Sequence, residues 1–139
     1  MSKAALYAIN STQQTLTGGG SVDLGNPLHG FGKTTCCQRS IDVSGNNLTL
    51  REGGMYGIVI SATVTASAAG TVTLQAFQDG VSFGVPQAVT IAAANDAVPV
   101  TLNLCPRVPC NCSSIITLVA TTTAGNVILG SVSTLAWKL

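Results

Sequence analysis

The sequence predicts an all-β protein, folded as an antiparallel sandwich of about 8–10 strands. Apolar and polar residues alternate at period two along most of the chain, which is typical of half-buried strands. Turn signals rich in Gly, Asn and Asp separate the alternating segments at short intervals. No segment combines apolar residues at the helical period with capping residues. That many short strands in 139 residues suits a two-sheet jelly roll.

The first third of the chain predicts short strands separated by turns. The Gly-rich residues 17–21 are expected to form a flexible turn, and Gly25-Asn26-Pro27 is expected to end a strand. Residues 29–39 show no alternation, so we expect them to be irregular. Short strands are expected at 4–9 and 22–24, and a short strand or an extended segment is expected at 11–16.

The segment 40–81 has the clearest strand pattern. A short strand pair is joined by the tight turn Gly45-Asn46-Asn47, and two longer strands follow, closed by the Asp79-Gly80 turn. The inward positions of these longer strands are expected to be Tyr56, Ile58, Ile60, Ala62 and Val64, then Val72, Leu74 and Ala76. The opposite face of the first is small and Thr-rich, with Val59, Ser61, Thr63 and Thr65, and is a candidate subunit contact.

The last third predicts further strands around one proline-containing loop. Residues 81–85 form a short segment broken by Gly84 and Pro86, because proline and glycine interrupt strands. The segment 105–112 contains two prolines and is expected to be a loop. Strands are expected at 88–92, 98–104 and 115–121, and one strand or a strand pair at 127–139.

Size and charge indicate a single domain over residues 1–139 that buries surface against other subunits. Charged residues make up only 8% of the chain, against about 25% in ordinary globular proteins. The net charge of +1 gives no electrostatic reason to expect nucleic-acid binding. Within the domain, residues 1–35 are expected to hold the N-terminal short strands and a candidate attachment segment.

The chain has neither of the apolar segments that would direct it to or through a membrane. The first ten residues contain a lysine but no continuous apolar run of a secretory signal. No span approaches the roughly 20 apolar residues of a transmembrane helix, so membrane insertion is not expected. We therefore expect synthesis in the cytoplasm.

The five cysteines fall in two predicted loops and leave three interpretations open. They could supply thiolates for a structural zinc ion, although Cys110-x-Cys112 is not the usual Cys-x-x-Cys spacing. They could form disulfides between the loops, although the number is odd and cytoplasmic synthesis disfavours bridging. They could also be free thiols. The candidate residues are Cys36, Cys37, Cys105, Cys110 and Cys112.

The sequence contains no combination of residues that is typical of a catalytic site, so we do not expect an enzyme. A catalytic cysteine would need His29 as its base, and no third group is available to orient that pair. The carboxylates lie singly in turns or at strand starts, which excludes a paired-carboxylate hydrolase. Trp137 is expected to pack in the core or at a subunit axis, with sugar stacking by Trp137 or Phe83 as the alternative.

From about residue 40 onward the chain resembles a known group of jelly rolls. The resemblance is carried by the strand start Gly54-Met55-Tyr56-Gly57, the turn and strand 69–74, the motif Asp79-Gly80-Val81, the apolar strand 115–119 and the C-terminal residues 135–139. This pattern resembles the jelly rolls similar to tumour necrosis factor and the complement globular head. An immunoglobulin sandwich fits less well, because no Cys…Trp…Cys spacing is present.

The resemblance implies a homotrimer and a role on the surface of a particle. Bacteria and phages use such domains as trimeric tips, spore-surface knobs and virion decoration. We expect a non-enzymatic virion protein, either a capsid decoration or a fibre tip, that contacts other virion proteins such as the major capsid protein. The alternative is a binding module that recognises glycans or a host-cell surface. The chain departs from this pattern in two respects, because it has no collagen-like Gly-X-Y stalk and its cysteines are unusual for the eukaryotic members.

Overall fold

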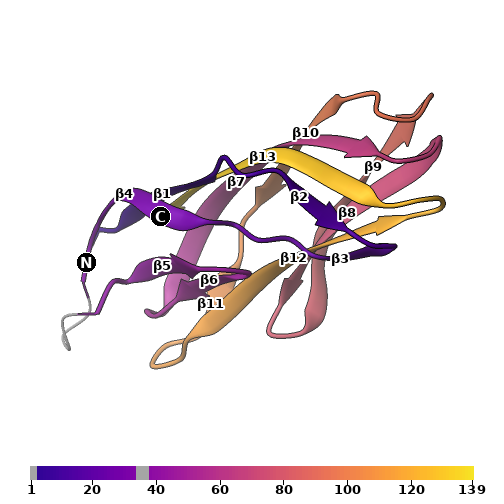
Figure 1. Ribbon diagram of the computed structural model, residues 1–139. Helices are drawn as coiled ribbons and strands as arrows, with labels where there is room; N and C mark the ends of the chain where they lie inside the picture. The colour runs from indigo at the N-terminus through magenta and orange to yellow at the C-terminus, as the bar shows by residue number, and fades with distance from the viewer. Residues whose placement is uncertain (1–2, 34–37) are drawn as a thin grey trace.

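The computed structural model describes residues 3–33 and 38–139, which form two antiparallel sheets packed face to face (Figure 1). The first sheet has the order β10-β7-β13-β1-β4, and the second has the order β5-β6-β12-β8-β9. Strands β11 and β2 extend the first sheet, and β3 extends the second. The predicted all-β sandwich is therefore confirmed. The described residues contain no helix long and apolar enough to cross a membrane.

The strands of the two sheets come from all parts of the chain. The first sheet contains β1 (Ala5–Asn10), β2 (Gln14–Leu16), β4 (Asn26–Phe31), β7 (Gly54–Ala66), β10 (Val98–Leu104), β11 (Arg107–Val108) and β13 (Val127–Lys138). The second contains β3 (Gly19–Ser21), β5 (Ile41–Ser44), β6 (Asn47–Leu50), β8 (Gly70–Gln78), β9 (Val81–Ile91) and β12 (Ser114–Thr122). The N-terminal short strands are thus built into both sheets.

One apolar core fills the space between the sheets. The inward positions predicted on β7 and β8 are all buried, including Tyr56, Ile60 and Leu74 at 1% exposure or less. Leu6 of β1 and Leu118 of β12 complete the core from neighbouring strands. Each large aliphatic side chain that is fully buried contributes roughly 1.5–3 kcal/mol to the hydrophobic driving force. Period-two alternation was therefore sufficient to find the core.

The Gly-rich segment differs from the prediction, because its second half is a strand. Gly19–Ser21 forms β3 and pairs with Val119–Thr121 of β12. The backbones approach so closely that a Cβ on Gly19 would lie 2.6 Å from the carbonyl oxygen of Ala120, and its φ is +107°. Only glycine fits this position without strain.

The predicted strand at 22–24 is wrong. Val22 and Leu24 are buried, but they lie outside the strands. The Val22 N–H donates to the Leu118 carbonyl at 2.8 Å, and the Leu24 N–H donates to the Gly45 carbonyl at 2.9 Å. Long-range backbone partners replace the regular ladder that the alternation suggested.

Two proline-containing segments that were expected to be broken or irregular are edge strands. β4 includes Pro27 and extends into the segment predicted to be irregular, and β9 continues through Pro86. Each strand lies at the outer end of its sheet, where proline is tolerated at bulges and at positions whose N–H would face solvent. A register shift in β9 opposite Gln75 accommodates Pro86, and the Gln75 side-chain amide donates to the Phe83 carbonyl at 2.9 Å.

The end of the chain forms one strand, and the predicted 105–112 loop contains another. β13 pairs with β7 along nearly its whole length, with one register shift between Leu129 and Ser131. Within the loop, Arg107–Val108 forms β11 and pairs with Met55 and Gly54 at the start of β7. Both features bring distant segments against β7, which is why local patterns did not reveal them.

A polar cluster closes one end of the core. The Tyr56 hydroxyl donates to the Glu52 carbonyl at 2.6 Å, and the Glu52 carboxylate accepts from Ser40 Oγ at 2.5 Å and from Lys138 Nζ at 3.0 Å. Ser40 and Tyr56 are fully buried. Burial raises the pKa of Tyr56 above its ordinary value of 10.0, since the phenolate would lose its hydration.

We expect Gly19→Ala to destabilise the protein by about 3 kcal/mol, because the new Cβ collides with the Ala120 carbonyl at a positive φ. Gly18→Ala is the matched control. Gly18 also has a positive φ but has no atom within 4 Å of the added Cβ, so about 1 kcal/mol is expected. Urea unfolding of both variants measures the difference, and equal losses would contradict the close packing of β3.

We expect stability to fall above pH 10, because the folded state retains the Tyr56 proton that the unfolded state has lost. The contribution of the Tyr56 hydroxyl to the free energy of unfolding is complete below pH 10. Above pH 10 it decreases by up to about 1.4 kcal/mol per pH unit. Denaturant unfolding between pH 8 and 11 measures this slope. Tyr56→Phe should flatten it, and a Tyr56→Phe variant that keeps the wild-type slope would refute the assignment.

Candidate interaction surface

The outward face of the first sheet is the candidate functional surface. Register places outward residues of neighbouring strands in rows: Tyr7 lies beside His29 and Leu135, and Leu135 lies beside Val59. In the next row Ala5 lies beside Phe31 and Trp137. With Met55 at the start of β7, we call these residues the open face: Ala5, Tyr7, His29, Phe31, Met55, Val59, Leu135 and Trp137.

The open face is apolar and accessible. The exposed fractions are 62% for Phe31, 47% for Met55, 44% for Leu135 and 38% for Tyr7. Five residues of the open face line a shallow pocket of about 140 Å³: Ala5, Tyr7, His29, Phe31 and Leu135. Polar side chains normally occupy the outward positions of a sheet that faces water. A contiguous exposed apolar patch is instead typical of an interaction site.

The strands that carry the open face are almost without charge. β1, β4, β7 and β10 contain no Asp, Glu, Lys or Arg, and β13 contains only Lys138, which pairs with Glu52 at the end of the core. Towards the other end of the sheet the outward positions are small and hydroxylated, as in the row formed by Ser133, Ser61 and Thr101. Strand β11 places Arg107 beside Met55, so this sheet face can be buried without desolvating an ionised side chain everywhere except at its Met55 end.

Trp137 lies on the open face, so it does not pack in the core, and the expected alternative of a subunit axis stays a prediction. Its indole covers Gly57 on the neighbouring strand, where an added Cβ would lie 2.4 Å from the ring. Trp137 is half-buried and Gly57 is buried beneath it. Phe83, the other residue considered for sugar stacking, packs against the core.

The structure describes three of the five candidate cysteines. Cys105 follows β10, and Cys110 and Cys112 lie in the β11–β12 loop; all three are exposed and free. The loop turns at Asn111, and the Cys112 N–H donates to the Pro109 carbonyl at 3.2 Å. Within residues 3–33 and 38–139 no group of three or more His, Cys, Asp or Glu side chains could hold a metal ion.

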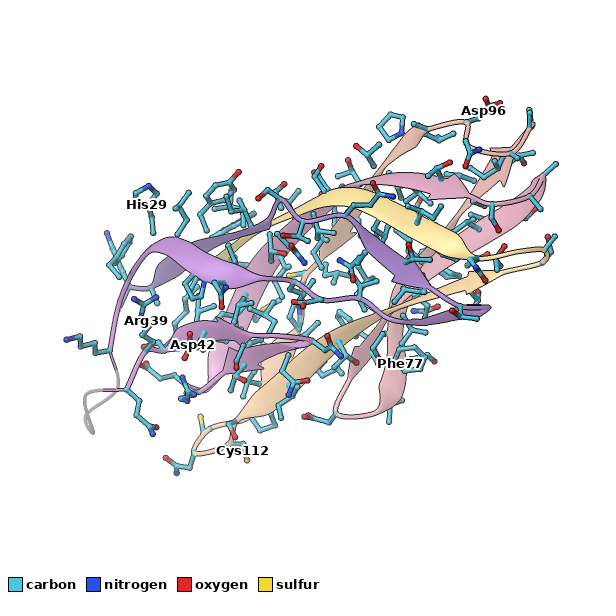
Figure 2. The ribbon with its side chains drawn as sticks, viewed as in Figure 1. His29, Arg39, Asp42, Phe77, Asp96 and Cys112 are labelled. Carbon is cyan, nitrogen blue, oxygen red and sulfur yellow. The ribbon has the colours of Figure 1, made fainter. Side chains whose placement is uncertain are left out.

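Cys36 and Cys37 lie outside the described residues, so the zinc and disulfide interpretations stay predictions. Lys33 and Arg39, which flank the segment with these two cysteines, form an isolated bridge. The Arg39 carbonyl accepts a hydrogen bond from the Arg51 side chain. Gly53, two residues after Arg51, packs against the backbone of Cys110. Figure 2 shows Arg39 and Cys112 at the same end of the molecule.

The carboxylates and His29 have no catalytic arrangement in the part of the chain that is described. Asp79 has a φ of +52°, and its carboxylate accepts from Ser114 Oγ and the Ile115 N–H, both at 2.9 Å. Asp79 therefore holds the β8–β9 turn against β12, as turn chemistry predicted. His29 lies on the open face, away from Cys112 (Figure 2).

Comparison with known proteins identifies the fold. No protein-family model matches the chain, and no curated protein matches its sequence. Among solved structures, murine APRIL at pH 5.0 aligns with a TM-score of 0.65 at 11% identity, covering 99% of each chain. The globular domain of zebrafish complement 1qA protein aligns with a TM-score of 0.62 at 8% identity, covering 99% of this chain and 97% of that one. The chain has the tumour-necrosis-factor-like jelly-roll fold.

A third similar structure is the PRD1 vertex protein P5. It aligns with a TM-score of 0.52 at 14% identity, covering 97% of this chain and 72% of that one. At such low identities these similarities establish the jelly roll and nothing about the residues of the open face. Sequence reasoning identified only the β7 part of this sheet face, through Val59 on the predicted contact side. It missed the neighbouring strands, although apolar residues such as Tyr7 and Leu135 at outward positions were a signal for them.

We expect Cys105, Cys110 and Cys112 to react with maleimide in the native protein, because all three are exposed. Mass spectrometry of the labelled protein counts these thiols and locates them. Protection that a chelator removes would show zinc, and protection that only a reductant removes would show a disulfide. Metal analysis of the same sample is the independent check.

Proposed function

We propose that this chain is a non-enzymatic structural protein that assembles as a homotrimer through the open face. The observation that carries the proposal is an apolar surface on strands that are almost free of charge. A chain with only 8% charged residues has little charge repulsion to keep such surfaces apart in water. Burial of the open face between copies removes this apolar area from water, and strands β1, β4, β7 and β10 add no ionic desolvation cost.

We further propose that the trimer is carried on a virion, as a capsid decoration or a fibre-tip protein in contact with other virion proteins such as the major capsid protein. The PRD1 vertex protein among the similar structures supports a place on a particle. The APRIL and complement 1qA structures support the same domain architecture without indicating a particle. Recognition of glycans stays the alternative, and saturable binding on a glycan array would favour it.

We expect Leu135→Arg to convert the trimer to monomers. Leu135 is 44% exposed at the centre of the open face, and an arginine there would place an unpaired charge in the subunit contact. Light scattering after size-exclusion chromatography measures the mass in solution. The wild type should have three times the 14.0 kDa mass of the chain, and the variant should have the mass of a single chain.

Ile115→Arg on the second sheet is the matched control. Ile115 is 41% exposed and also lies within a strand, but it faces away from the open face. This variant should remain trimeric. A monomeric wild-type protein at micromolar concentration, or equal effects of the two variants, would contradict assembly through the open face.

A further inference from the structure

We propose that His29 makes assembly through the open face dependent on pH, so that acidification between pH 7.5 and 5.5 releases the subunits. The inference rests on the proposed homotrimer. His29 is the one histidine in the chain, and it lies in a row of the open face beside Tyr7, with Leu135 next along the row. Histidine is the side chain whose ordinary titration falls between pH 5 and 8.

Strands β1, β4 and β13 place no Asp or Glu beside His29. Strand β5, which packs against β4, carries Asp42, and that carboxylate pairs with Arg51 at 3.4 Å. Strand β1 presents Tyr7 and β13 presents Leu135, and Phe31 follows on the same strand as His29. The ionised groups nearest along these strands are cations, Lys33 beyond Phe31 and Lys3 before Ala5. Asp and Glu are absent from all five main strands of the sheet.

The energetic consequence follows from burial. A neutral imidazole can enter an apolar contact if its ring nitrogens find partners, whereas a charged imidazole without a counter-ion loses its hydration. The assembled state therefore binds fewer protons than the separated subunits, and protonation favours separation as the pH falls. At pH 5.5 the protonated form of an ordinary histidine side chain outnumbers the neutral form by about ten to one. Dissociation is then favoured about tenfold per subunit, or about 1,000-fold for a trimer.

The test measures the trimer dissociation constant by analytical ultracentrifugation at pH 7.5 and 5.5. The wild-type constant should rise by about 1,000-fold, whereas His29→Gln should give nearly the same constant at both pH values. His29→Lys places a permanent charge at the position and should be monomeric at pH 7.5. Far-ultraviolet circular dichroism of the separated subunits at pH 5.5 should retain the β-sheet signal, which distinguishes dissociation from unfolding.

The outcomes separate this inference from the proposed function. A protein that is monomeric at both pH values refutes the homotrimer. A trimer with the same dissociation constant at both pH values refutes the role of His29 and leaves the homotrimer intact. A His29→Gln variant that dissociates as strongly as the wild type also refutes it, because another group would then be responsible.

Discussion

The pairing of β7 with β13 is the contact on which the rest of the structure depends. It joins the middle of the chain to its C-terminal residues and aligns the inward positions of both strands with the core. The same register places Leu135 beside Val59 on the open face and lays Trp137 over Gly57. At the end of the strand, Lys138 reaches Glu52 and closes the core beside Tyr56.

The two faces of this strand pair have different physical roles. The second sheet covers the inward face, so folding of a single chain removes its apolar side chains from water. The outward face is apolar at one end and hydroxylated at the other, and a single copy of the chain leaves it in water. The proposed assembly accounts for both the low charge of the chain and the position of its exposed apolar side chains, since one contact removes that surface from water.

The failures of sequence reasoning have a common physical origin in non-local pairing. β3 is a strand because Ala120 approaches Gly19, and β4 and β9 tolerate proline because they lie at sheet edges. The position of these segments is set by the order of strands in the sheets, and a local sequence pattern does not reveal that order. Conversely, the Asp79 turn was predictable, because its side chain and backbone requirements are set within a few residues.

By itself the sequence determined the fold class, the inward residues of β7 and β8 and the loop position of the described cysteines, because period-two alternation and turn chemistry act over short distances. The tertiary structure decided which outward residues meet. Tyr7, Leu135 and Val59 come from three segments far apart in the chain, and only the register of β1, β13 and β7 gathers them into one surface. Register is set by the burial of the opposite face, so the open face is a consequence of how the core packs.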